Sequence, residues 1–267
     1  MAASKKYVLV VGGGTFLGDS IAAALLAEGA EVTLLTRPGA EEKLGLLAQR
    51  VRLRTADVWN PASLKGQARG HTSVVNAVGS TIADPSQGLN YNWLNFVSAR
   101  NVANMCVSDG VSHLVLLSSV AAPWLNRRYI RSKRDAENYV RRIGLKPTII
   151  RAPVAYVPGQ PRPLVYRFVT LFGKIPPLSW LYFGKRAPMP VDVMVRGIAR
   201  ITLEQPPAGT IFYASQLRKY GKAPSDFAFL EQHPETSGHV HHHAPLLDIL
   251  DEDTPFGWSP PGGREDI

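Results

Sequence analysis

The sequence predicts an α/β fold built on a doubly wound, mostly parallel sheet. The first observation is a continuous apolar run at 7–11, which suits a strand buried on both faces. The second is its continuation into a glycine turn at 12–18, an Ala- and Leu-rich helical segment at 19–29 and another apolar run at 31–36. The third is the recurrence of this alternation along the chain. Strands that alternate with helices through short loops form a parallel sheet covered by helices.

Later segments extend the same pattern. Further strands are expected at 51–56, 113–119 and 147–151, and a strand with its turn at 73–79. A helix is expected at about 90–108, where apolar residues recur at spacings of three and four. Strands in this number fit a doubly wound sheet in a single large domain.

Composition limits the function classes. The 267 residues carry a formal net charge of +9, and 45% of them are hydrophobic, which excludes wholesale disorder. The one cysteine, Cys106, excludes a disulfide framework and a multi-thiolate zinc site. No apolar run approaches the roughly 18 residues of a spanning helix, so no integral membrane protein is expected. The positive charge predicts an acidic partner; the alternative is that a basic isoelectric point is common among proteins of matrix-type compartments and indicates no ligand.

The glycine turn between strand and helix predicts a dinucleotide site. Backbone N–H groups at a helix N-terminus meet the charge of a diphosphate, and glycines let the chain come close to it. Spacing by three from the first glycine places Thr15 where a side chain should crowd the phosphates, unless Gly14 takes over the turn. A tight turn without a ligand is the alternative. The predicted binding residues here are Gly12, Gly14, Thr15, Phe16, Leu17 and Gly18.

Residues after the next strands bear on which dinucleotide binds. Arg37 stands where an acidic residue would bind the ribose 2′-hydroxyl of NAD, and a guanidinium there pairs with a 2′-phosphate. The sequence therefore favours NADP(H) over NAD(H), with a solvated loop arginine as the alternative. Asp57 is placed to face the adenine ring or to cap a turn. The remaining predicted cofactor contacts are Val58, Ala77, Val78, Gly79 and Lys133.

Three further residues predict carbonyl chemistry. Ser119 ends a predicted strand, at the sheet edge where open α/β sheets bind ligands. Tyr129 and Lys133 share a helix face, and an ammonium beside a phenol lowers the pKa of the phenol. The serine would orient a carbonyl group and the tyrosine would transfer a proton. The alternative is that the pair only fixes the nicotinamide ribose.

In this order of motifs the chain resembles the short-chain dehydrogenase/reductase superfamily, in its extended or atypical branch. The resemblance covers about residues 7–217 and includes the Arg-x-Pro turn at 148–153. Pro190–Val193 resembles the family's later segment that returns to the sheet. The resemblance implies a Rossmann domain over 1–217 with a small substrate-side lobe at 160–190.

Within that branch the segments 128–133 and 167–176 are similar to the nucleotide-binding accessory subunits of mitochondrial respiratory complex I. That resemblance implies NADPH held for assembly and stability without turnover, on the matrix side of the inner membrane. The layout is also similar to reductase-like proteins of coenzyme Q biosynthesis. The alternatives are an NADP-dependent reductase or epimerase-like enzyme, with quinone metabolism as one setting, and a cofactor-free scaffold that binds RNA or ribosome-like particles.

Two departures count against turnover, and together they favour the accessory subunit. The connection from Ser119 to Tyr129 is shorter than in active family members, and Thr15 replaces the middle glycine. Geometry must bring both groups to one carbonyl before pKa matters.

Surface features predict partners. Arginines crowd the segment 127–142, and aromatic and basic residues mix at 161–188, which is typical of an element at a membrane surface. Residues 218–267 lack periodicity and predict an extended, irregular C-terminal tail that lies along other subunits. RNA is the less favoured partner, because no stacking motif is present. A flexible histidine run such as His239–His243 rarely binds metal, so no metal site is predicted.

Overall fold

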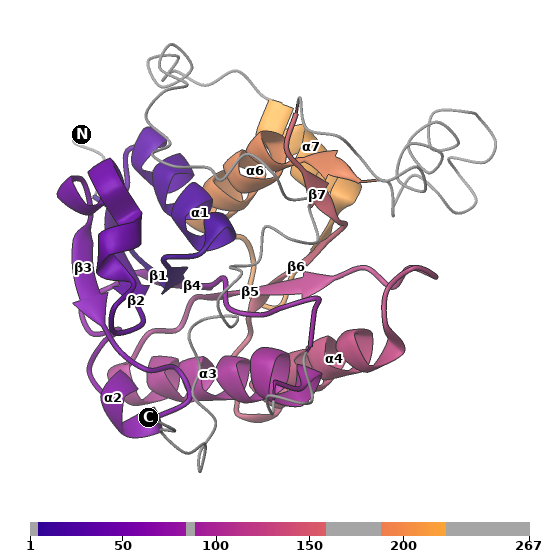
Figure 1. The fold of residues 1–267 in the computed structure, drawn as a ribbon, viewed down its shortest axis with the longest axis horizontal. Coiled ribbons are helices and arrows are strands. Elements are labelled where there is room, and N and C mark those ends of the chain that lie inside the picture. Colours follow the sequence, from indigo (N-terminus) through magenta and orange to yellow (C-terminus); the bar gives the residue numbers. More distant parts are fainter. Residues whose placement is uncertain (1–4, 84–88, 159–187, 223–267) are drawn as a thin grey trace, which may run out of the picture.

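Seven parallel strands form one sheet within residues 5–83, 89–158 and 188–222, the parts of the chain that this computed structural model describes (Figure 1). The strand order is β3-β2-β1-β4-β5-β6-β9, which is the doubly wound order of a Rossmann sheet. The strands are β1 (Tyr7–Gly13), β2 (Glu31–Thr36), β3 (Arg52–Thr55), β4 (Ser73–Asn76), β5 (Leu114–Ser119), β6 (Thr148–Ala152) and β9 (Ile211–Tyr213). The predicted fold class is confirmed.

Helices cover both faces of the sheet (Figure 1). One face carries α1 (Phe16–Ala27), α6 (Val191–Glu204) and α7 (Ala214–Lys222); the other carries α2 (Pro61–Leu64), α3 (Ser98–Asp109) and α4 (Arg127–Arg142). A kinked 3₁₀ segment, η1 (Glu41–Gln49), joins β2 to β3.

The hydrophobic core follows from the alternation of side chains along the buried strands. Val10 and Leu34 pack with α1 and α6, whereas Leu9 and Leu116 pack with α3 and α4. β1 pairs with β2 and β4 on its two sides and helices cover both faces of the sheet, so its residues from Val8 onward are buried. A continuous apolar sequence is the expected composition of such a strand.

Three elements differ from the sequence prediction. The helix expected at 90–108 begins with a π-helical turn, η3 (Asn92–Val97), and becomes α3 only at Ser98. The segment at 190–193 does not return to the main sheet. Instead β8 (Met189–Pro190) pairs with β7 (Ala155–Tyr156), and α6 follows directly. The strand that does return is β9, which is too short to show periodicity.

The predicted domain boundary falls inside a helix. α7 continues through Leu217 to Lys222, because Leu217 is buried against α6. Three predicted segments lie largely outside the described residues. They are the lobe at 160–190, described only from residue 188, the aromatic and basic segment 161–188, described only at residue 188, and the tail, described only up to residue 222. No helix in the described part of the chain is long and apolar enough to span a membrane.

Candidate active site

The glycine turn is built as a helix cap. Gly12 and Gly14 take positive φ angles of 126° and 78°, which residues other than glycine rarely adopt. Thr15 is the N-cap of α1: its hydroxyl accepts a hydrogen bond from the Gly18 amide at 3.2 Å and donates one to the Gly12 carbonyl at 2.7 Å. A Cβ on Gly18 would lie 2.0 Å from that same carbonyl oxygen.

This geometry gives Thr15 a structural role in the turn. The hydroxyl is engaged within the turn, and Gly14 supplies the left-handed residue that the turn needs. Thr15 therefore caps α1, since a threonine at this position satisfies an amide that would otherwise lack a partner. The expected crowding of the phosphates by Thr15 stays a prediction. The carboxylate of Asp19 accepts a hydrogen bond from the Gly14 amide at 2.9 Å.

Arg37 and Asp57 lie just after the carboxyl ends of neighbouring strands β2 and β3. Arg37 is partly exposed. The Asp57 carboxylate accepts a hydrogen bond from the Trp59 amide at 2.9 Å, and Val58 is buried with its carbonyl bound by Asn101. These hydrogen bonds fix the segment at Asp57 and Val58, next to the end of β2 that carries Arg37.

Ser119, Tyr129 and Lys133 converge on one buried site. Burial raises the pKa of Tyr129 to about 12, against a hydrogen bond with the Ser119 side chain and the positive charge of Arg134. Burial lowers the pKa of Lys133 to about 8, and the nearby Glu137 carboxylate opposes this shift. The predicted lowering of the tyrosine pKa by Lys133 is therefore absent here: desolvation of the phenol dominates.

The Lys133 ammonium is held by backbone rather than by the phenol. Its Nζ donates to the Leu117 carbonyl at 3.2 Å, at the end of β5. Gly79, with φ at 146°, passes so close that a Cβ there would lie 2.5 Å from Nζ and 2.6 Å from Oδ1 of Asn95. Only glycine fits between these two groups.

Asn95 is a site residue that the sequence analysis missed. It is buried in η3, and its side chain forms two hydrogen bonds with the backbone of Ser80. Its Oδ1 accepts one from the Ser80 amide at 3.1 Å, and its Nδ2 donates one to the Ser80 carbonyl at 2.9 Å. In sequence it is one of several asparagines in the segment 90–108, and nothing sets it apart from the others. The π-helical turn around it, a local geometry frequent at functional sites, has no sequence signature.

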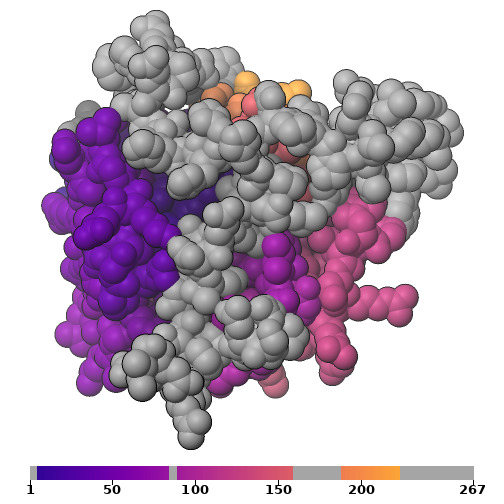
Figure 2. Space-filling model, in the orientation of Figure 1, coloured from indigo at the N-terminus to yellow at the C-terminus, as the bar shows by residue number. Residues whose placement is uncertain are grey.

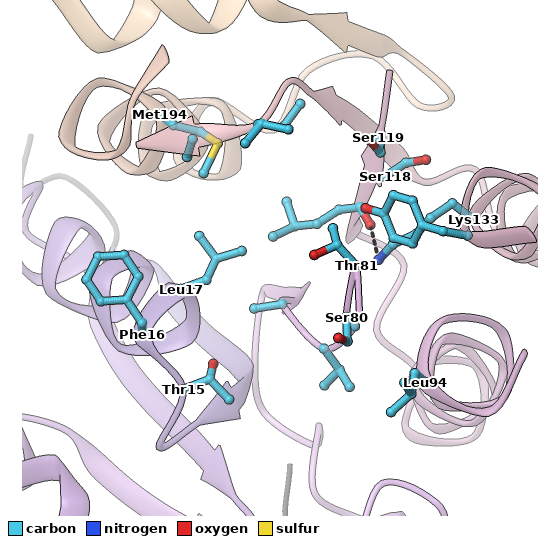
Figure 3. A pocket seen from close by; sticks show the side chains of 18 of the residues that line it. Thr15, Phe16, Leu17, Ser80, Thr81, Leu94, Ser118, Ser119, Lys133 and Met194 are labelled. Carbon is cyan, nitrogen blue, oxygen red and sulfur yellow. Dashed lines mark hydrogen bonds between the residues drawn. The ribbon is translucent and has the colours of Figure 1, made fainter. Parts of the chain in front are cut away.

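One pocket joins the glycine turn to the three converging residues (Figure 3). Figure 3 shows Phe16 and Leu17 of α1 on one side, and Ser118, Ser119 and Lys133 on the other. The predicted site residues that line it are Thr15, Phe16, Leu17, Ala77, Val78, Gly79, Ser119, Tyr129 and Lys133. Gly12, Gly14 and Gly18 shape the turn beneath it, and Arg37, Asp57 and Val58 lie at the ends of β2 and β3.

The arginines of 127–142 divide into two groups. Arg127, Arg128, Arg131, Arg141 and Arg142 are exposed. Figure 2 shows side chains of the pink segment that contains α4 projecting from the molecule. Arg134 instead turns inward and bonds to Ser118 and Ser119. It belongs to the site and not to the predicted docking surface.

Within the described residues no cluster of histidine, cysteine and acidic side chains could hold a metal ion. The run His239–His243 lies outside the described residues.

Comparison with known proteins agrees with this geometry. A family model described as NAD(P)H-binding matches residues 12–162. No curated protein sequence matches the chain.

Several solved structures share the fold. The oxidoreductase ylbE from Lactococcus lactis is 16% identical with a TM-score of 0.58, over 89% of this chain and 100% of its own. A wide-type short-chain dehydrogenase/reductase from Veillonella parvula, in complex with NADP, is 16% identical with a TM-score of 0.56, over 77% and 92%. A double mutant of the dTDP-glucose 4,6-dehydratase DesIV from Streptomyces venezuelae, with NAD bound, is 25% identical with a TM-score of 0.55, over 77% and 74%.

Proposed function

The chain belongs to the NAD(P)H-binding family, and from this premise we propose that it is an NADP(H)-dependent reductase of the short-chain dehydrogenase/reductase type. The carrying observation is that Ser119, Tyr129 and Lys133 line the same pocket as the residues of the glycine turn. Dinucleotide and carbonyl chemistry need this proximity, since hydride and proton must reach one group. The fold shared with a dehydratase and with oxidoreductases supports an enzyme over an accessory subunit.

The residues fit a dinucleotide. A Cβ on Gly18 would collide with the Gly12 carbonyl, and one on Gly79 would collide with Lys133, so glycine keeps both the turn and the Lys133 side of the pocket closely packed. The α1 N-terminus faces the phosphate position, and the Lys133 ammonium would hold the ribose hydroxyls. Arg37 at the end of β2 would pair with a 2′-phosphate, which is why we propose NADP(H) rather than NAD(H).

The protonation states favour carbonyl reduction. The bound reduced dinucleotide supplies a hydride. Ser119 would orient the carbonyl oxygen, and Tyr129, whose pKa of about 12 keeps its hydroxyl protonated at neutral pH, would donate the proton. Lys133, with a pKa of about 8, is mostly protonated at pH 7 and would supply a positive charge near the phenolate left behind, with its Nζ 6.0 Å from the centre of the ring.

The pocket lining supports an uncharged, largely apolar carbonyl compound as substrate. Among the described lining residues Lys133 is the one charged side chain, and it is bonded to Leu117. Leu125, Val154 and Met194 line the pocket as well. Among the described lining residues a carboxylate or phosphate on the substrate would have only Lys133 as a charged partner, so its desolvation would be costly. Quinone precursors are one member of this class.

The test is NADPH oxidation with a panel of apolar ketones, aldehydes and quinones. The proposal predicts turnover with at least one of them that is lost in Tyr129→Phe. NADPH bound tightly but never oxidised across the panel would contradict it.

That contrary result would support a second candidate, an accessory subunit that holds NADP(H) without turnover in a membrane-associated mitochondrial assembly such as complex I. Its specific support is the short Ser119–Tyr129 connection, together with a Lys133 ammonium that is bound to the Leu117 carbonyl rather than to the phenol. In this candidate the nucleotide stabilises the fold by mass action. The exposed arginines of α4 would then contact other subunits.

A further inference from the structure

A buried carboxylate lies directly behind the candidate site. The Glu137 side chain is 1% exposed and lies one helical turn beyond Lys133 on α4. Its Oε2 accepts from Nη2 of Arg151 at 2.6 Å, and its Oε1 accepts from Nε of Arg151 at 3.1 Å and from Oγ of Ser118 at 2.5 Å. Arg134 forms a third charged contact. The bonds and the arginine charges hold the pKa of Glu137 below its usual range despite burial, so it is ionised.

The two arginines extend this cluster to the strand ends. Arg134 donates to Oγ of Ser118 at 2.9 Å and to the carbonyl of Ser119 at 2.7 Å. Arg151 on β6 donates to the Tyr213 hydroxyl of β9 at 2.9 Å. One carboxylate therefore connects α4, which carries Tyr129 and Lys133, to the ends of three adjacent strands.

Stability alone is a weak reason for such a cluster. A buried ion group must overcome the loss of hydration of every charge, and apolar side chains of similar volume often serve the fold as well or better. Apolar contacts, unlike hydrogen bonds, do not fix the orientation of the groups that they join. Charged hydrogen bonds of this kind fix the relative placement of the atoms that they join.

We propose that Glu137 is a positioning residue: with Arg134 and Arg151 it fixes the end of β5 against α4, so that Ser119 stays opposite Tyr129. The proposal rests on the proposed function, since it assigns a role within that site. It explains how a short connection between Ser119 and Tyr129 still brings the two side chains together. It also gives two adjacent serines different partners: both line the pocket, but Ser118 is bound to Glu137, whereas the Ser119 side chain meets Tyr129.

The cluster also acts on the charge of the site. Lys133 is faced by Tyr129 and Glu137 from its own helix, by the Leu117 carbonyl of β5, and by Gly79 and Asn95. Glu137 is the one negative charge in this set, and it favours the ammonium form. Tyr129 is faced by Ser119, by Arg134 and by Tyr91.

The test compares Glu137→Gln with Glu28→Gln in the full chain. Glu28 is a matched control, because it also forms an arginine pair, with Arg200 at 2.7 Å, and is mostly buried but lies at the far end of α1. Measured for each are the thermal midpoint, the dissociation constant of NADPH from pH 6 to 9, and kcat and KM with any carbonyl that the wild type reduces.

A positioning role predicts effects that lost stability does not. In Glu137→Gln the pH at which NADPH affinity falls should move down by about half a unit or more, because a unit charge one turn away is lost. The kcat should fall about tenfold or more while KM changes little. Glu28→Gln should lower the thermal midpoint but change neither the pH profile of NADPH affinity nor kcat.

An unchanged pH profile and kcat in Glu137→Gln, with a lower thermal midpoint, would overturn the proposal and leave a structural ion cluster. If Glu137→Gln fails to fold, the paired variant Glu137→Gln/Arg151→Met removes one charge of each sign and is measured in its place. A wild type that binds NADPH but reduces no carbonyl contradicts the proposed enzyme, and the pH profile still decides the role of Glu137. A wild type that binds no NADPH overturns both.

Discussion

The ammonium nitrogen of Lys133 lies 6.0 Å from the centre of the Tyr129 ring, on the same buried face of α4. The phenol meets the Ser119 side chain, whereas the ammonium is bound to the Leu117 carbonyl. In the proposed reductase the two groups would have different tasks: Tyr129 would donate the proton, and Lys133 would bind the ribose and supply a compensating charge.

Tyr129→Phe separates these tasks. We expect carbonyl reduction to fall about 100-fold or more, because a positioned general acid contributes on that scale. NADPH affinity should change by less than about threefold, since the ring and Lys133 remain. Steady-state kinetics and a fluorescence titration measure the two effects. Turnover that survives the substitution would exclude Tyr129 as the acid.

Arg37→Glu tests the choice of dinucleotide. We expect NADPH affinity to fall about tenfold or more while NADH affinity stays the same or rises, because a charge-assisted contact to the 2′-phosphate is lost. The control is Arg142→Glu, which makes the same change of net charge at the far end of α4 and should affect neither the NADPH affinity nor the NADH affinity. An equal loss for NADPH and NADH would contradict a phosphate-binding role for Arg37.

Gly79→Ala tests the close approach beside Lys133. The new Cβ would need the space 2.5 Å from Nζ, so we expect the lysine to shift and NADPH affinity to fall about tenfold or more. Gly209→Ala is the control: its φ is also positive, at 84°, but nothing lies within 4 Å. Both variants should lose stability from backbone strain. Only Gly79→Ala should lose affinity, and equal NADPH affinities in the two variants would contradict this account.

His113 makes stability depend on acid pH. Burial, with the charge of Lys6, lowers its pKa from 6.5 to about 4, and its ring bonds to Ser73 and Thr148. Above pH 6.5 the ring is neutral in folded and unfolded chains alike. As pH falls from 6.5 towards 4, the unfolded chain takes up a proton that the folded chain does not, so stability decreases.

The expected loss from His113 is about 2 kcal/mol in the free energy of unfolding between pH 7 and pH 4.5. His113→Gln has no titrating ring and should lose correspondingly less over that range. Urea unfolding of both proteins at the two pH values measures this. An identical loss in both would show that His113 is not the acid-sensitive group.

Local sequence was enough to predict the sheet and one side of the site. The apolar runs of β1 and β5, the glycines of the turn and the spacing of Tyr129 and Lys133 are short-range signals, and each marks a place that the topology brings to one edge.

The parts that the sequence did not predict depend on contacts between distant segments. Glu137 reads as one charge on a basic helix until folding brings Arg151 of β6 to it. Arg134 was assigned to the surface for the same reason. Asn95 depends on Ser80, and the role of Thr15 as a cap depends on the conformations of Gly12 and Gly14. Such pairings are settled by tertiary packing and not by local pattern.

The most direct test of the central claim, that this pocket binds NADP(H) against Lys133, is calorimetric titration of the full chain with NADPH. We expect one equivalent to bind, and we expect Lys133→Met to weaken binding about tenfold or more while the thermal midpoint of the free protein does not fall. A folded wild-type chain that binds neither NADPH nor NADH, or a Lys133→Met variant with unchanged affinity, would contradict the account.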